Sequence, residues 1–474
     1  MKSSRGGRLL RLTLALMLSW NLLQPAPAGA LTIEDERQVG RDALESIKRG
    51  SVLLEDDSCR DYLDNLGRRL VGALGPQVFD YKFYIIKNDL INAFAAPGGY
   101  IFIYSGLITT VKSEGELAGI LCHEVAHVTS RHIANRLSQG KVAALASLGG
   151  LIAGAFIGGP IGAAMALGSM AGGASAQLHY SREDEREADQ KGLDYLVTAG
   201  YDPKFMGDGF WSLLRSDWPS QDDFPTYLST HPGLGERIGS VETAILAHPG
   251  YGRIKGRGDE VSFQAFQNRV LALTGSATRV FNHFQAMVKS NPESAAGHYG
   301  LAMYHQRRQN LDQAVKEFGL ALKYQPANVS FMTDFGDLLI QLKDFDGAMK
   351  ILSKAVVLRP NSTRILFLLG RTYEETGVPD RSRKLYERAV IQDPQNTEAL
   401  YHLGVICGRQ GDLARSHLYM GLYFKERGET RNALYHLRRA QEKADAVPPE
   451  VQERIGQALR DLEAPFGGGG PPSM

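Results

Sequence analysis

The C-terminal half of the chain repeats with a period of 34 residues, and this period constrains the fold more than any other feature. Columns of matching residues recur at that spacing: the prolines Pro292, Pro326, Pro360 and Pro394, the small residues Ala314, Ala348, Ser382 and Ser416, the large residues Phe318, Leu352, Tyr386 and Met420, and the glycines Gly336, Gly370 and Gly404. Small residues at fixed positions let two helices approach closely, while the large ones fill the space between them. Such helix pairs stack on their neighbours into an α-solenoid.

The period is that of the tetratricopeptide repeat (TPR), a helix pair that carries no chemistry of its own. After the fourth unit the phase shifts by half a repeat, because Gly411 and Gly428 are 17 residues apart. The helix after Gly411 is therefore expected to serve two helix pairs, and a half-unit at Phe281–Pro292 is expected to cap the other end. We predict a TPR solenoid over residues 263–460 and a disordered tail, rich in glycine and proline, over 461–474.

The N-terminal half contains an HExxH motif, HEVAH, from His123 to His127. Ser113 and Glu116 form an S-x-x-E capping pattern, and the apolar residues that follow predict a buried helix through the motif. Two histidines four residues apart lie on one face of a helix, so both can bind a single zinc ion. Glu124 can then deprotonate the water whose pKa zinc lowers. The alternative is a buried histidine pair satisfied by hydrogen bonds.

A catalytic zinc site of this kind needs one further protein ligand besides two histidines and a water. The metzincin pattern HExxHxxGxxH is excluded, because Ser130 replaces its glycine and Ile133 replaces its last histidine. His132 is out of register for that role. The third ligand must therefore come from another segment, and the completed site would hold one Zn²⁺ per chain.

The best candidate for this ligand is Glu185, in the run SREDEREAD that extends from Ser181 to Asp189. Ser181 is a good N-cap and the acidic residues after it suit the first turn of a helix. Glu185 and Asp189 share a face of this helix, so one can bind zinc while the other orients a histidine. Without the HExxH motif, the same run would be interpreted as a solvated charged helix.

These segments resemble a known family. HEVAHVTSRH, SREDEREAD and the upstream stretch NAFAAPGGY are similar to the gluzincin metallopeptidases that include HtpX and the CAAX prenyl proteases, and the repeats point to their soluble, TPR-bearing branch. The resemblance implies the following site residues: His123, His127 and Glu185 as zinc ligands, Glu124 as catalytic base, and Asp189 as support for a ligand. The fold expected on this basis is mainly α, with a gluzincin-type helical metallopeptidase domain and a small β-sheet over residues 31–262, followed by the TPR solenoid.

The resemblance also implies a function. We expect a zinc-dependent endopeptidase that cleaves unfolded or misassembled envelope proteins, with the outer-membrane barrel assembly machinery as a partner of the TPR repeats. The alternative is a zinc-stabilised chaperone or scaffold whose peptidase site is largely latent. Nucleic acid is not expected as a partner, because 53 basic residues balance 52 acidic ones and no basic block follows the N-terminal segment.

His231 lies in a Ser-Thr-His-Pro sequence far along the chain from the motif, and three roles are open to it. Near the metal it could stabilise the oxyanion that forms when a peptide carbonyl is attacked. It could instead take the open fourth position on zinc and hold the enzyme idle. A histidine before a proline can also be only a turn residue.

The first thirty residues have the pattern of a secretory signal peptide. An apolar run from Leu12 to Leu23 follows several basic residues, and Ala28-Gly29-Ala30 predicts cleavage before Leu31. The residue directly after that point is Leu31 and not a cysteine that could carry a lipid, so we expect a periplasmic protein that is not a lipoprotein. An uncleaved anchor is the alternative, although the apolar run is short for a membrane span. The three cysteines are expected to pack in the core without a disulfide: Cys59, Cys122 and Cys407.

Two further segments of residues 31–262 bear on function. Short strands are predicted at Tyr81–Ile86 and Tyr100–Tyr104. A strand beside the zinc could pair with an extended substrate, although a purely structural hairpin is equally consistent with the sequence. Residues 142–177 carry no charge and are rich in glycine and alanine. The glycine pairs in this segment favour a mobile hairpin or lid over the cleft, with membrane contact as the alternative.

Overall fold

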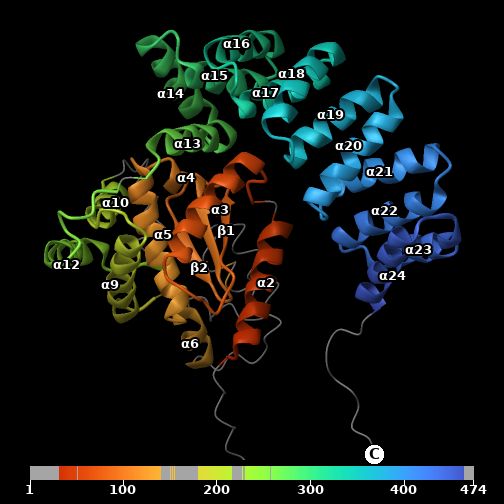
Figure 1. The fold of residues 1–474 in the computed structure, drawn as a ribbon. Coiled ribbons are helices and arrows are strands. Elements are labelled where there is room, and N and C mark those ends of the chain that lie inside the picture. The colour runs from red at the N-terminus through yellow and green to blue at the C-terminus, as the bar shows by residue number, and fades with distance from the viewer. Residues whose placement is uncertain are drawn as a thin grey trace, which may run out of the picture. The chain divides into compact units, whose positions relative to one another are not determined.

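The computed structural model describes residues 31–50, 52–139, 180–215, 230–256 and 258–463, with the isolated residues 150, 152, 154 and 227. The chain forms two compact units, Met1–Gly275 and Ser276–Met474, whose elements are labelled in Figure 1. The predicted signal peptide, nearly all of the 142–177 segment and the tail beyond residue 463 lie outside the described residues. Among the described residues, no helix combines the length and hydropathy needed to cross a membrane.

The first unit contains a three-stranded sheet formed by β1 (Lys82–Ile86), β2 (Ala93–Ala96) and β3 (Tyr100–Tyr104). The strand order is β1-β3-β2, with β1 parallel and β2 antiparallel to β3. Strands β1 and β3 match the two predicted strands, whereas β2, at the other edge of the sheet, was not predicted. Its sequence, Ala-Phe-Ala-Ala, has little of the β-branched character that identifies strands, and packing rather than propensity stabilises it.

The sheet lies between two layers of helices (Figure 1). Helix α2 (Ile33–Arg49) packs Val39, Ala43 and Ile47 on the face that carries Phe102 and Tyr104. Helix α3 (Asp57–Gly72) packs on the opposite face, which carries Ile101 and Ile103. The alternation of β3 side chains between these two cores follows from the two-residue period of a strand.

Helix α5 (Glu114–Thr129) is the centre of the first unit, and its residues from Glu114 to Val128 are all buried. Among the described residues, the helices of this unit that follow the sheet along the chain are α4 (Ser105–Ile108), α5, α6 (His132–Gln139), α9 (Arg182–Thr198), α10 (Lys204–Leu214), α12 (Leu234–Ala247) and α13 (Glu260–Thr274). Helix α5 packs against α9, α10 and β2. A Cβ added to Gly192 of α9 would lie only 3.0 Å from Cα of His123, so this glycine permits the close approach of α9 to the HExxH helix.

The second unit is a series of antiparallel helix pairs: α14 (Ala277–Ser290), α15 (Ala295–Arg307), α16 (Leu311–Tyr324), α17 (Val329–Gln341), α18 (Phe345–Leu358), α19 (Thr363–Glu375), α20 (Pro379–Gln392), α21 (Thr397–Arg409), α22 (Leu413–Glu426), α23 (Thr430–Gln441) and α24 (Pro449–Glu463). The predicted columns meet between helices. A Cβ added to Gly336 would lie 2.6 Å from the side chain of Leu352, and one at Gly370 would lie 2.7 Å from Tyr386. The fold prediction of a TPR solenoid is confirmed.

The half-repeat shift is also explained by the packing. Helix α22 contacts both α21 and α23. Met420 of α22 packs over Gly404 of α21, while Gly421 of α22 admits Leu437 of α23, where an added Cβ would lie 2.6 Å from the leucine. One helix therefore takes part in two pairs, as the sequence predicted. All three cysteines are buried and free.

Candidate metal centre

Helix α5 carries the two histidines and the glutamate of the HExxH motif. Its N-terminus is capped by Ser113, whose side chain accepts a hydrogen bond from the backbone N–H of Glu116. The carboxylate of Glu116 does not complete the expected capping box, because it accepts from Lys112 N and from Ser212 Oγ instead. The four-residue spacing places the Nε2 atoms of His123 and His127 3.0 Å apart on one face of the helix.

Helix α9 brings Glu185 to these histidines. Ser181 caps the helix and Asp184 completes a capping box with it, so Glu185 begins the second turn with its carboxylate completely buried. Its Oε1 lies 3.5 Å from His127 Nε2, and its Oε2 lies 3.5 Å from His123 Nε2. The structure thus brings together the three residues that the sequence proposed as metal ligands.

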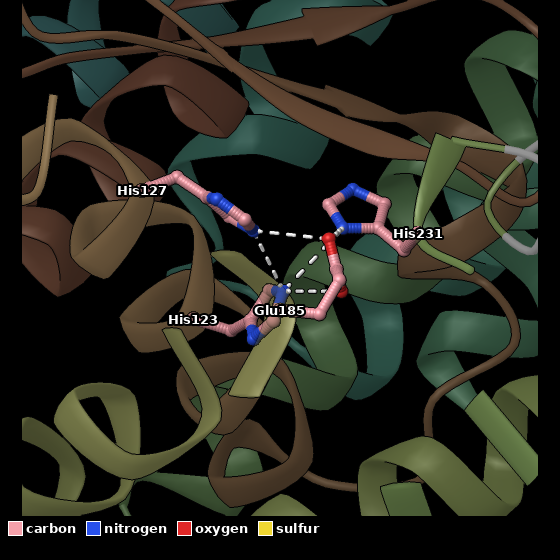
Figure 2. Close-up of side chains that lie close together, drawn as sticks. All are labelled: His123, His127, Glu185 and His231. Atoms are coloured by element: carbon pink, nitrogen blue, oxygen red, sulfur yellow. Dashed lines mark hydrogen bonds and ion pairs between the residues drawn. The ribbon is translucent and has the colours of Figure 1, made fainter. Parts of the chain in front are cut away.

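His231 joins the same cluster from the loop before α12 (Figure 2). Its Nδ1 lies 3.0 Å from Glu185 Oε1 and 3.4 Å from His123 Nε2. One potential ligand atom from each of His123, His127, Glu185 and His231 lies within 4.8 Å of the others, and all four residues are buried. On its other side, His231 Nε2 lies 3.5 Å from Glu124 Oε1 and 3.4 Å from the carbonyl oxygen of Ala93.

Two observations show that a metal ion fits this cluster. Imidazole nitrogens and a carboxylate oxygen converge there, and this is the donor set that zinc takes in catalytic sites. In addition, both carboxylate oxygens of Glu124 are buried without a hydrogen bond from any residue that the structure describes. A buried carboxylate without partners is costly, so the site calls for a further polar group beside Glu124, as a catalytic water would provide.

Behind the ligands, Asp189 and Arg237 form a buried charged pair. Asp189 Oδ1 lies 3.1 Å from His123 Nδ1, which is the position expected for a group that orients this histidine. Arg237 donates to both oxygens of Asp189, at 2.8 and 2.5 Å, and its third nitrogen donates to Glu185 Oε2. Sequence reasoning did not assign Arg237 a role, because a single arginine in the first turn of α12 has no spacing that links it to α9.

Burial and neighbouring charges set the protonation of the cluster. Burial raises the pKa of Glu124, against the weaker lowering effect of His231 and His123. Burial also holds the pKa of His127 well below its usual value, which favours the neutral ring that a metal ligand requires. Burial would lower the pKa of His123 too, but the carboxylates of Asp189 and Glu185 outweigh it and raise that pKa to about 9. Metal binding at His123 therefore competes with a proton.

Aromatic rings also line the site, and sequence reasoning did not identify them. Tyr180, just before α9, stacks on His127 with ring centroids 3.6 Å apart. Tyr227 stacks on His231 at 4.2 Å. Both tyrosines are almost completely buried, and they precede the N-cap of α9 and the loop of His231 respectively. The nearness in sequence of each tyrosine to a predicted site residue is the only signal that could have identified them.

Comparisons with known proteins found matches for both parts of the chain. Residues 59–245 match the family model described as Peptidase family M48, and residues 299–363 and 339–403 match two models described as Tetratricopeptide repeat. The first match spans the HExxH helix, Glu185 and Arg237, and the other two together cover residues 299–403 of the solenoid.

Relatives named as proteases extend the likeness. The putative beta-barrel assembly-enhancing protease of Vibrio cholerae serotype O1 is 33% identical over 222 residues, which are 46% of this chain and 46% of the relative. The beta-barrel assembly-enhancing protease of Escherichia coli strain K12 is 27% identical over 360 residues, covering 74% of this chain and 72% of the relative. The mitochondrial metalloendopeptidase OMA1 of Schizosaccharomyces pombe is 26% identical over 223 residues, 45% of this chain and 61% of the relative. The chain thus spans about half the length of the Vibrio relative in that alignment.

Proposed function

We propose that this chain, which carries a peptidase family M48 domain followed by TPR repeats, is a zinc-dependent endopeptidase that cleaves unfolded or misassembled proteins of the cell envelope. The observation that carries the proposal is the convergence of His123, His127 and Glu185 in one buried cluster beside Glu124, whose carboxylate oxygens accept no hydrogen bond from the residues that the structure describes. We propose the first unit as the catalytic region and the second unit as the region that binds substrates or partners. Helix α13 crosses the predicted boundary between residues 262 and 263, and it packs Phe263 and Phe266 in the core of the first unit.

The side chains divide the chemistry of peptide hydrolysis among them. His123, His127 and Glu185 would hold the zinc ion, which supplies a Lewis acid and lowers the pKa of a water. Glu124 would take a proton from the attacking water and pass it to the leaving amine, and its buried carboxylate is suited to both steps. Asp189 orients the ring of His123. Arg237 holds Glu185 and Asp189 in place, and its positive charge offsets one of these two buried negative charges.

Of the three roles open to His231, the geometry favours that of a fourth ligand which keeps the site idle. Its Nδ1 lies among the atoms that would bind the metal, 3.0 Å from Glu185 Oε1. A residue that only stabilises an oxyanion would point at the place of the substrate carbonyl and leave the metal position open. We propose that His231 must move away before a substrate binds, and after that movement it could still donate a hydrogen bond to the reacting carbonyl.

The outer edge of β2 supports a closed resting state. Asn92 O accepts a hydrogen bond from Tyr104 N, so the carbonyls of Ala93 and Ala95 point away from β3. Instead of a neighbouring strand, Ala93 O meets His231 Nε2 at 3.4 Å and Ala95 O accepts from Tyr180 Oη at 3.4 Å. We propose that an extended substrate pairs with this edge by main-chain hydrogen bonds and displaces both side chains.

The setting of the activity rests on the relatives and on the N-terminal sequence. Two relatives are named for enhancing beta-barrel assembly, which supports envelope proteins as substrates and the outer-membrane barrel assembly machinery as a partner of the TPR repeats. The basic and apolar pattern of residues 1–30 supports export to the periplasm by a cleavable signal peptide. Two roles are open for residues 142–177, namely a lid over the cleft and contact with a membrane. Binding of the full chain to lipid vesicles tests the second role.

Cleavage of casein, an unfolded protein, by the purified chain tests the proposed activity. The expected result is slow cleavage that stops when a chelator removes the metal and returns when Zn²⁺ is added back. A zinc-stabilised scaffold would bind zinc equally well but would leave casein intact, both as purified and after His231→Ala.

A further inference from the structure

His132 is a buried histidine that lies against the HExxH motif without belonging to the converging group. It is the first residue of α6 and only 4% exposed. Its Nδ1 lies 2.8 Å from Nδ1 of His127, on the side of that ring away from the cluster. The sequence excluded His132 as a metal ligand because of its register, and the structure places it outside the group of convergent ligand atoms.

We propose that His132 is a positioning residue that selects the tautomer and orientation of His127 and thereby tightens metal binding. The inference rests on the proposed function in one respect, namely that His127 binds the metal. It concerns a residue that does not touch the metal, and its test does not depend on peptide cleavage.

The hydrogen-bonding capacity of the two rings leads to this assignment. Nε2 of His127 faces the cluster, 3.0 Å from Nε2 of His123, so it is the atom that can bind a metal. A neutral histidine that gives the lone pair of Nε2 to a metal carries its proton on Nδ1. That N–H needs an acceptor, and Nδ1 of His132, at 2.8 Å, is in place to accept it.

Accepting at Nδ1 in turn requires His132 to carry its own proton on Nε2. The structure provides carboxylates for that proton, because Nε2 of His132 lies 3.5 Å from Glu187 Oε2 and 3.9 Å from Asp184 Oδ1. The other oxygen of Glu187 accepts from Ser130 Oγ at 3.0 Å and from Lys191 Nζ at 2.7 Å, which keeps the carboxylate in position. The proton positions therefore form one consistent series. The Nδ1–H of His127 points to Nδ1 of His132, and the Nε2–H of His132 points to the carboxylate of Glu187.

An unusual turn puts His132 in this place. Arg131, between α5 and α6, has φ 56°, a left-handed conformation that residues other than glycine rarely adopt. The Arg131 side chain is held by the buried carboxylate of Glu36 and donates to the carbonyl oxygen of Leu31 at 2.6 Å. The turn ends α5 and starts α6 at once, so His132 packs back against the ring of His127, with centroids 5.0 Å apart. Strained backbone of this kind is found where a side chain must be aimed.

Each histidine of the motif then has its own support. His123 is oriented by Asp189 from α9, at 3.1 Å, and His127 is oriented by His132 from α6. Groups in such positions behind a metal ligand typically change metal affinity by about 10- to 100-fold when they are removed. Histidine is a weaker acceptor than a carboxylate, so we expect the lower half of that range.

The test is zinc affinity, measured on the full chain by competition with a chromophoric chelator in the inactive Glu124→Gln background. His132→Leu removes the acceptor and is expected to weaken zinc binding by about 10-fold or more. His132→Asn is the matched variant, because an asparagine Oδ1 can take the place of Nδ1, and it is expected to restore affinity to within about 3-fold of the parent. Asn135→Ala, on the exposed side of the same helix, serves as the control and is expected to leave affinity unchanged.

A second readout follows the tautomer directly. Proton–nitrogen correlation spectra of the imidazoles are expected to show His127 with its proton on Nδ1 in the parent and a mixture of tautomers in the metal-free His132→Leu chain. Unchanged zinc affinity in a folded His132→Leu protein would overturn the inference while leaving the proposed function intact. Equal losses in the Leu and Asn variants would also overturn it, since packing alone would then account for them. Failure of the Glu124→Gln chain itself to bind zinc would instead contradict the proposed function.

Discussion

Arg237 donates a hydrogen bond to each carboxylate oxygen of Asp189, so the residue that faces His123 is held from behind by a buried guanidinium. The same arginine also donates to Glu185 and lies 5.3 Å from the ring of Phe210. One cation thus supports a proposed metal ligand and the side chain that orients another. This contact ties the start of α12 to the face of α9 that carries both carboxylates.

Arg237→Met is expected to destabilise the metal-free protein by about 3 to 5 kcal/mol, because it leaves two buried carboxylates without their counter-charge. Denaturant unfolding in the presence of a chelator measures this cost, and added zinc should recover part of it. Arg182→Met is the control, since its ion pair with Glu236 is exposed, at 58% and 72%, and worth less than about 1 kcal/mol. Equal effects of the two substitutions would mean that Arg237 is not essential to the site.

Glu124→Gln keeps the shape of the side chain and all the proposed ligands but removes the base. Zinc content, measured by atomic absorption, is expected to stay at about one ion per chain, as one site requires. Casein cleavage should fall by about 100- to 10,000-fold, the range typical for loss of a general base. Near-normal cleavage in this variant would be incompatible with the proposed mechanism.

Substitutions of Glu185 and Glu187 distinguish a proposed metal ligand from a second glutamate that lies nearby on the same helix. Glu185→Ala should lose zinc during purification, because Glu185 is the one carboxylate donor in the cluster that the described residues form. Glu187→Ala should retain zinc, because Glu187 is half exposed and lies outside the cluster. Since Glu187 is the outer partner of His132, we expect a small loss of zinc affinity, about 2- to 5-fold and well below the range for direct removal of a ligand partner. The reverse order of the two variants would show that the register of α9 is misassigned.

His231→Ala distinguishes a blocking ligand from an oxyanion donor. If His231 keeps the site idle, its removal should raise the basal rate of casein cleavage by about 10-fold or more, as expected when an active state is a minor population. Loss of an oxyanion donor would instead lower kcat by about 100-fold with zinc retained. A variant with unchanged rate and unchanged zinc content would make His231 a turn residue only.

Asp412 makes the stability of the TPR unit depend on pH. It caps α22, accepting from Arg415 N at 3.2 Å, and also accepts from Arg383 Nη2 at 3.0 Å. Burial alone would raise its pKa, but the hydrogen bonds from Arg415 and Arg383 lower it below the ordinary value of 3.8. A carboxylate whose pKa is lowered by folding stabilises the fold above its unfolded pKa, and that contribution is lost as the pH falls through the folded pKa.

Asp412→Asn keeps the cap and removes the charge. We expect it to lower the free energy of unfolding by about 1 kcal/mol at neutral pH, as for a charge-assisted hydrogen bond on a side chain that is 19% exposed. The difference between the two proteins should shrink as the pH falls below 3.8. Urea unfolding of both proteins at neutral and acid pH measures it. A difference that persists in acid would assign the effect to packing and not to charge.

The sequence alone determined the features that depend on spacing along a helix. His123 and His127 share a face because they are four residues apart, and Glu185 and Asp189 do so for the same reason. The 34-residue period specified helix pairs in the same way, since Gly336 and Leu352 meet within one repeat. These are consequences of local backbone geometry, which the order of residues is enough to define.

Only the tertiary structure decided which faces meet. Gly192 lets α9 approach the backbone of His123, and this approach places Glu185 at the histidines. The left-handed turn at Arg131 aims His132 at His127, although no helical spacing relates the two rings. His231 and Arg237 reach the same site from a later loop and helix, because burial of polar groups selects partners by charge and hydrogen bonding across space. Periodicity within one element contains no information about such contacts, so packing alone could assign them.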